Sequence, residues 1–414
     1  MQLPGKAGFG MGDFSEVNLR RVSLLGGFCF FLSALEYLVP KPLPFLRLGL
    51  ANFPLLLALD VLPFPSFVLL IGLKVIGQAL ISGTLFSYVF LFSVAGTAVS
   101  ALLMYAARNV FRKERISLIG TSTAGALAFN GVQLLLARVF VFGESVRYAA
   151  APILGLGLVT GTLLGALCEY FIKRSTWYKV KGKREKVKEK RESREQRAES
   201  NEQRKEEEAK LRNAREAFCE KTFNSNELAV AGLCMVPALL FNPDTPARVL
   251  QFLFFFLLAW LSGKRNNLLI MVSVMAGIIF FNLLVPYGEV LFSLGPLVVT
   301  KGALMGGIRR AVTLEGLLML SRSCVRRDLA LPGAFGKIVG ESFRVFSILT
   351  EERQFFTRRN WFSRLDGLLV SLEESPAENE VVAEKNPATS GGRLVLVIMV
   401  ILAWLPFFLV YGNN

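Results

Sequence analysis

The chain is divided in two by the stretch KVKGKREKVKEKRESREQRAESNEQRKEEEAKLRNAREAF, residues 179–218. This stretch is the centre of a charged segment, 174–222, in which basic residues outnumber acidic ones and no apolar stripe recurs at helical spacing. Glu and Lys or Arg recur four residues apart, which supports an isolated charged helix. We therefore interpret 174–222 as a cytoplasmic linker, part helix and part disorder, between two apolar bundles.

The half that precedes this linker contains six apolar runs. A membrane-spanning helix needs about 20 largely apolar residues, because the hydrocarbon core is about 30 Å thick. The runs that we predict as spans are 22–39, 46–62, 66–82, 86–107, 116–142 and 149–172. The link between the first two, PKPLPFLRLGLANFP (40–54), is too rich in proline for a plain helix end, so part of it is expected to re-enter the membrane or line a cavity.

The half that follows the linker contains five predicted spans and one amphipathic region. The spans are 226–242, 248–262, 267–286, 293–320 and 393–411. Charged residues interrupt the span 293–320, which predicts that it is buried in protein; they are Lys301, Arg309, Arg310 and Glu315. The arginine-rich region 322–364 predicts two amphipathic helices along the inner membrane surface. An acidic stretch, 373–392, is expected to be disordered.

The distribution of positive charge predicts the orientation. Arg20 and Arg21 precede the first run, RNVFRKER (108–115) follows the fourth, and a basic segment begins at Lys173. Lys and Arg concentrate in cytoplasmic loops, so six crossings with a cytoplasmic N-terminus place all three groups inside. We predict an all-α polytopic protein of a bacterial inner membrane, with 11 transmembrane helices in two bundles (6 + 5) and the C-terminus outside. The predicted domains are 1–21 (cytoplasmic segment), 22–173, 174–222 (linker) and 223–414.

Composition excludes several classes of chemistry. Of the 414 residues, 53% are hydrophobic and 19% charged, and the net charge is +15. No nucleic-acid module accompanies this charge, so no nucleic-acid partner is expected. The chain has no histidine, no adjacent aspartates to hold magnesium against a diphosphate, and no G-x-x-x-x-G-K-[ST] loop for ATP. We expect no catalytic residue, no metal site and no cofactor bound by this chain, so any energy source must lie on a partner.

Polar residues within the apolar runs are the candidate solute-binding residues, because burying such groups in lipid is costly. For any single one of them, a hydrogen bond between helices is the better explanation. Together they suggest a polar cavity within one small bundle, and Glu36 and Lys74 are candidates for a mutual ion pair. The substrate-binding candidates are Glu36, Arg47, Asn52, Lys74, Gln78, Thr84, Asn130 and Gln133.

Three motifs of the first half carry a resemblance. PKPLPFLRLGLANF (40–53), LISGTLFS (80–87) and ALAFNGVQLLLA (126–137) resemble the bacterial Gx transporter family, whose older label is heptaprenyl diphosphate synthase component I. Relatives commonly carry a histidine before the asparagine of the third motif, whereas Phe129 precedes Asn130 here. The six-span plan of that family is similar to the S components of energy-coupling-factor (ECF) importers, which bind vitamin-like solutes.

The second half resembles the T subunit of the same importers, the CbiQ-like family. The residues that carry this resemblance are NLLVPYGEVLFSLGPLVVTKGALMGGIRRAV (282–312) and the arginine-rich region after them. The resemblance implies that two amphipathic coupling helices dock on a pair of cytoplasmic ABC-type ATPases. Those partners would bind ATP and magnesium and hydrolyse the ATP. The candidate docking residues are Arg326 with Arg327 and Arg358 with Arg359, although neither pair keeps the small-Arg-small triplet of that family.

Three functions remain open from the sequence. The first is the membrane module of an ECF-type importer, which binds a small vitamin-like, prenyl or flavin-type solute. Its two domains would pack through the small residues of the first span, Gly26, Gly27, Ser33 and Ala34. The second is an accessory membrane subunit of polyprenyl diphosphate or quinone synthesis. The third is a membrane scaffold for flavin-dependent electron transfer.

Overall fold

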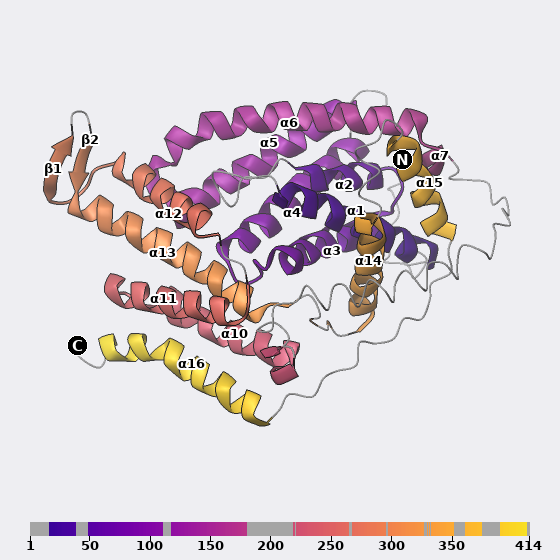
Figure 1. The fold of residues 1–414 in the computed structure, drawn as a ribbon. Coiled ribbons are helices and arrows are strands. Elements are labelled where there is room, and N and C mark those ends of the chain that lie inside the picture. Colours follow the sequence, from indigo (N-terminus) through magenta and orange to yellow (C-terminus); the bar gives the residue numbers. More distant parts are fainter. Residues whose placement is uncertain are drawn as a thin grey trace, which may run out of the picture.

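The computed structural model describes most of both halves of the chain. The described residues are 16–38, 49–110, 117–179, 218–219, 221–264, 267–294, 297–326, 329, 331, 333–351, 361–374 and 390–411. The structure is almost entirely helical, with one two-stranded sheet (Figure 1). Most of the linker and most of the acidic stretch lie outside the described residues, so their predicted conformations are not addressed by the structure.

The first half forms a helical bundle. Its elements are α1 (Glu16–Leu38), η2 (Leu50–Asn52), α2 (Phe53–Ala58), α3 (Phe64–Ser82), α4 (Tyr88–Val110), α5 (Leu118–Ala137), a π-helical turn η3 (Arg138–Phe142), η4 (Gly143–Ser145), α6 (Val146–Arg174) and α7 (Thr176–Lys179). Helix α1 is largely enclosed by its neighbours: Phe28, Phe30 and Phe31 are at most 2% exposed. The apolar runs therefore predicted the helices of this half, with one exception.

The exception is the second predicted span, 46–62. In its described part only η2 and the six-residue α2 are helical, and six residues rise about 9 Å, far less than a bilayer core. The prolines at 40–44 and Pro54 signal an interrupted helix. The prediction of a full crossing helix here was wrong. The prediction that the link is not a plain helix end agrees with the conformation of Gly49, whose φ of 84° lies in the left-handed region.

Helices α5 and α6 pack as a close antiparallel pair through glycines of α6. A Cβ on Gly157 would lie 2.1 Å from Asn130 Nδ2, one on Gly161 2.7 Å from Ala126, and one on Gly165 2.5 Å from the Cα of Ile119. Glycines four residues apart let two backbones approach. These glycines thus serve helix packing.

The second half is a smaller group of helices with a hairpin. It comprises α10 (Ser225–Leu240), α11 (Thr245–Leu261), α12 (Leu268–Leu283), β1 (Val290–Leu294), β2 (Leu297–Thr300), α13 (Lys301–Cys324), α14 (Gly333–Glu351), α15 (Trp361–Glu374) and α16 (Ser390–Tyr411). Strands β1 and β2 pair antiparallel from Leu294↔Leu297 to Val290↔Thr300. The predicted helical span 293–320 is therefore wrong at its start: residues 293–294 and 297–300 lie in the two strands, and the helix begins at Lys301.

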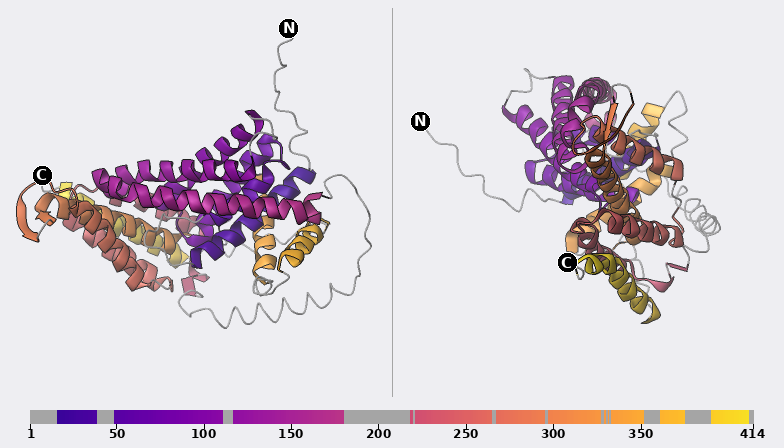
Figure 2. Two further views of the ribbon diagram at one scale, coloured as in Figure 1. Left: turned by 90° about the horizontal axis from the view of Figure 1, so that it is seen from above. Right: turned by 90° about the vertical axis from the view of Figure 1, so that its left-hand side faces the viewer.

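The two amphipathic helices expected after α13 are present as α14 and α15. Helix α14 packs against α1 with Ser342, Val345 and Leu349, each at most 3% exposed, whereas Lys337 and Gly340 on its other face are exposed. Figure 1 shows α14 running steeply across the direction of α6. Both helices lie at the end of the molecule where α6 terminates, opposite the hairpin and the end of α16 (Figure 2).

Four helical stretches are long and apolar enough to cross a membrane. They are Phe64–Ser82, Tyr88–Asn109, Leu118–Arg174, which contains both α5 and α6, and Ser390–Val410. The chain is therefore a protein with several membrane-compatible helices. In the part of the chain that the structure describes, the predicted count of eleven is not reached. Helices α10, α11 and α12 have only 16 or 17 residues, and charged residues lie in the middle of α13.

Candidate functional site

The most polar group of buried residues in the first half surrounds the turn η2. Lys74 on α3 donates a hydrogen bond to Asn52 Oδ1 at one end of this turn. At its other end, the backbone N–H of Gly49 donates to Glu36 Oε1 on α1 at 3.4 Å. Lys74 and Glu36 are 3% and 2% exposed. The structure thus brings Glu36, Asn52 and Lys74 together around one turn, with the two charged groups at its opposite ends.

The backbone conformation at Gly49 helps to explain why these side chains meet. Gly49 permits the left-handed backbone that starts the turn, and its carbonyl accepts from Asn52 N at 2.8 Å. In the short turn η2, the side-chain amide of Asn52 lies close to Lys74 in the middle of α3. An ammonium, a carboxylate and an amide at such a turn can hydrogen-bond a small polar or zwitterionic group.

Gln78 extends this polar surface toward α4. It lies one helical turn beyond Lys74 on α3, and Ser93 Oγ donates to Gln78 Oε1 at 3.4 Å. Further along the same face of α4, the buried hydroxyls of Thr97 and Ser100 have no hydrogen-bond partner among the described residues. Unpaired buried hydroxyls are costly, so this face of α4 is a candidate contact for a bound molecule.

Asn130, Gln133 and Thr84 lie elsewhere. Asn130 Nδ2 donates to the carbonyl of Ile153 on α6 at 3.0 Å, so its contact fits the structural alternative of a bond between helices. Gln133 is 1% exposed on the same helix. Thr84 belongs to the turn after α3, where its N–H donates to Ala79 O and its hydroxyl contacts Ser82 Oγ at 2.8 Å.

Three of the four predicted docking arginines, Arg327, Arg358 and Arg359, lie outside the described residues. The binding candidate Arg47 lies outside them as well. Arg326 is described and half-buried. Its Nη1 donates to the carbonyl of Phe223 at 3.2 Å, which ties the end of α13 to the start of α10.

Close packing of the two halves through the small residues of α1 agrees with the prediction. A Cβ on Gly27 would lie 2.5 Å from Val345 Cβ and 2.7 Å from the carbonyl oxygen of Ser342. A Cβ on Gly26 would lie 2.9 Å from Ser342 Oγ, but it would lie closer, at 2.2 Å, to Leu73 Cδ2 of α3 in the same bundle. Gly27 is therefore the glycine required where α14 crosses α1, and this contact joins the first bundle to the amphipathic region of the second half.

A second contact of the halves was not anticipated from the sequence. Asp366 on α15 accepts hydrogen bonds from Thr176 N at 2.8 Å and Trp177 N at 3.1 Å, and also from the hydroxyls of Ser175 and Thr176. Burial by itself raises the pKa of a carboxyl, but these four hydrogen bonds outweigh it and hold the pKa of Asp366 below its usual range. No local sequence signal could have indicated this pairing, because the partners are some 190 residues apart.

The other end of the molecule carries a third contact. Arg310 Nη1 on α13 donates to Asn282 Oδ1 at 2.7 Å, and Asn282 Nδ2 donates to the carbonyl of Val141 in η3 at 3.1 Å. The rings of Phe142 and Phe281 pack beside them, with centroids 5.0 Å apart. Arg310, which is half-buried, thus takes part in joining the halves, whereas Lys301 and Arg309 on the same helix are exposed.

An apolar groove lies between α10 and α16. It has a volume of about 460 Å³ and is lined mainly by Val230, Ala231, Leu396, Val397 and Val400. The exposed ion pair Arg393–Glu227, 2.9 Å apart, borders it. Among the residues that the structure describes, no group of three metal-ligating side chains occurs.

Comparison with known families finds one match in each half of the chain. Residues 25–171 match the family described as heptaprenyl diphosphate synthase component I, and they span the first bundle from α1 to α6. Residues 227–327, from α10 to the end of α13, match a domain of unknown function. No curated protein and no solved structure matches the chain.

Proposed function

We propose that the chain is the membrane module of an ECF-type importer in a bacterial inner membrane. Residues 22–173 bind a small solute, and residues 223–414 couple it to separate cytoplasmic ABC-type ATPases. The chain itself catalyses nothing and holds no cofactor. The observation that carries the proposal is the crossing of α14 over Gly26 and Gly27 of α1. At this crossing an amphipathic helix is in direct contact with the candidate solute-binding bundle.

The free face of α14 is the proposed docking surface for an ATPase. Lys337 and Gly340 are exposed on it, and a Cβ on Gly340 would meet nothing within 4 Å. The opposite face is occupied by α1, so a partner that moves α14 would move α1 with it. The buried turn between Glu36, Asn52 and Lys74 is the proposed solute contact, since α1 also supplies Glu36.

The test is co-purification of ATPases with the tagged chain from membranes of its own host. We expect an ATP-binding-cassette pair to co-purify with the wild-type chain and with a Gly391→Trp control, and to be lost from Gly340→Trp. The control also adds a large ring at an open helical glycine, but on α16. Charge reversal of Arg326 together with Arg327 should likewise abolish association. Retention of the ATPases by these variants would contradict the proposed docking surface.

A second candidate is an accessory subunit of polyprenyl diphosphate synthesis, which the description of the matching family favours. It predicts that the purified chain stimulates a soluble prenyltransferase in the absence of ATP. Measuring product formation with and without the chain separates the two candidates, since an importer module would leave the rate unchanged.

A further inference from the structure

The short helix α7 is held from two sides at the end of the first bundle. From the second half, Asp366 on α15 accepts the N–H groups of Thr176 and Trp177 and thereby caps the start of α7. From the first half, Tyr178 Oη donates to Asp60 Oδ2 at 3.4 Å. Adjacent residues of a four-residue helix therefore contact carboxylates of different halves of the chain.

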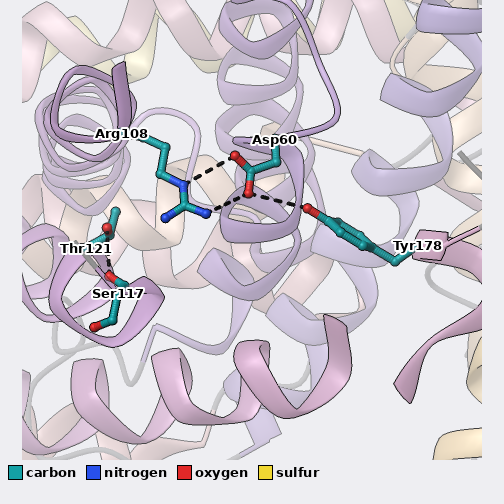
Figure 3. Close-up of polar contacts among 5 residues, drawn as sticks. All are labelled: Asp60, Arg108, Ser117, Thr121 and Tyr178. Carbon is teal, nitrogen blue, oxygen red and sulfur yellow. Dashed lines mark hydrogen bonds and ion pairs between the residues drawn. The ribbon is translucent and has the colours of Figure 1, made fainter. Parts of the chain in front are cut away.

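Asp60 in turn pairs with Arg108 at the end of α4. Arg108 Nη2 lies 2.9 Å from Asp60 Oδ2 and Nε lies 3.3 Å from Oδ1, a two-point contact whose side chains are only 12% and 9% exposed (Figure 3). Tyr178 reaches the same carboxylate from the opposite side (Figure 3). The ends of α2, α4 and α6 are thus gathered at one carboxylate.

The contacts form a series from one half to the other. Asp366 fixes the backbone of α7, α7 fixes the ring of Tyr178, and Tyr178 supplies a hydrogen bond to the buried pair of Asp60 and Arg108. Within α7, Tyr178 N also donates to Ser175 Oγ at 3.1 Å, and Ser175 is itself bonded to Asp366. A displacement of α15 therefore reaches Asp60 through groups that are all hydrogen-bonded to their neighbours.

We propose that Asp366 and Tyr178 are positioning residues that couple α15 to closure of the cytoplasmic end of the first bundle. While α15 holds α7, the ends of α2, α4 and α6 stay together; when α15 moves away, α7 is released and this end opens. The inference rests on the proposed function for its source of motion and its purpose, the release of a solute into the cytoplasm. The contact between α15 and the bundle stands without it.

Cys168 provides a reporter that is independent of transport. It lies on α6, is fully buried, and is close enough to Asp60 and Arg108 to interact with them electrostatically. Cys324 on α13 is equally buried, in the other half, and serves as the internal control for general unfolding. The full-length chain in vesicles is treated with N-ethylmaleimide, and mass spectrometry of its peptides gives a labelling rate for each cysteine.

Asp366→Asn and Tyr178→Phe are the informative variants, because each keeps the size of its side chain. We expect each to raise the labelling rate of Cys168 at least fivefold while Cys324 stays protected. Glu373→Gln, the control on α15, removes a carboxylate that pairs with Arg21 at 2.8 Å, and it should change the Cys168 rate less than twofold.

The double variant tests whether the two residues act in series. If they do, Asp366→Asn with Tyr178→Phe labels no faster than the faster single variant; independent anchors would multiply their effects. A multiplicative effect, or wild-type protection of Cys168 in Asp366→Asn, overturns the inference. Because these rates are measured without ATPases, failure of the wild-type chain to co-purify ATPases in the earlier test would refute the proposed function and leave this result standing.

Discussion

The two halves of the chain meet at both ends of the molecule, and the two contacts use different chemistry. At the end near α15, glycines of α1 admit α14, and the carboxylate of Asp366 holds α7. At the hairpin end, an amide and a guanidinium, Asn282 and Arg310, join α12 and α13 to η3. The first contact includes a group that titrates and the second does not, since neither an amide nor arginine changes charge in the accessible range. In the proposed coupling, the first contact moves and the second stays in place as a pivot. We call them the movable contact and the pivot contact.

The largest expected effect is at the glycine crossing. Gly27→Ala should destabilise the chain by about 3 kcal/mol, because its Cβ would overlap Val345 and the backbone of Ser342. Gly72→Ala on α3, where a Cβ meets nothing within 4 Å, should instead gain about 0.5–1 kcal/mol from helix propensity. Thermal unfolding in detergent measures both. Equal effects of the two substitutions on thermal stability would contradict the close contact of Gly27 with α14.

The pivot contact comes next. Asn282→Ala should cost about 2 kcal/mol, because it removes the acceptor of Arg310 and leaves a buried carbonyl of Val141 without this donor. Asn282→Asp keeps an acceptor for Arg310 and gives it a charged partner, but its carboxylate would face the carbonyl oxygens of Val141 and Ile278, so this variant separates the acceptor role from the donor role. Both differences from wild type should stay constant between pH 5 and 8 in thermal unfolding. A pH-dependent cost of Asn282→Ala would contradict the contrast between the two contacts.

Acid should weaken the movable contact. Asp366 has a lowered pKa in the folded chain, so its contribution is complete above the pKa of an unfolded aspartate, about 3.9, and is lost as the pH falls through the folded value. Asp366→Asn should therefore be less stable than wild type at pH 7 by about 1.5 kcal/mol, the scale of a hydrogen bond to a charged group. The gap between the two melting temperatures should narrow as the pH falls below about 4. A gap that does not change with pH would show that the charge of Asp366 is not what matters.

The smallest effect concerns the other carboxylate of α15. Glu373 pairs with Arg21 at 2.8 Å, but the side chains are 26% and 21% exposed, so Glu373→Gln should cost roughly 0.5 kcal/mol or less. Added salt at about 1 M should abolish even this difference in melting temperature. A larger, salt-resistant cost would mean that α15 is held at two equivalent points rather than mainly at Asp366.

The sequence predicted most helices because apolar runs of the right length are local signals. It also predicted two amphipathic helices after α13 and the packing role of the small residues on α1. It failed where backbone detail decides. The predicted span 46–62 holds only the short elements η2 and α2 in its described part. In 290–300, Gly295 and Pro296 stand between two apolar runs, a sequence pattern typical of a hairpin that a hydropathy window does not distinguish from a span.

The candidate site was predictable only in part. Polarity inside apolar runs identified Glu36, Asn52 and Lys74, which the structure brings to one turn, but the same signal selected Asn130, whose contact is explained by helix packing. The pairing of Asp366 with α7 depends on tertiary contacts between distant segments, so no spacing or motif could reveal it. The sequence thus yields candidate groups, and the fold decides which of them meet.

The covalent joining of the two halves limits which solutes the proposed importer can serve. Joined partners meet at an effective concentration that reaches the millimolar range for short flexible tethers. Here the attached bundle is additionally fastened through Gly27 and Asp366. A free solute-binding subunit encoded elsewhere would have to displace this resident copy at a far lower concentration. If the proposed function holds, the importer would therefore be a dedicated carrier with one solute-binding domain per coupling domain, rather than a coupling unit shared among several solute-binding subunits.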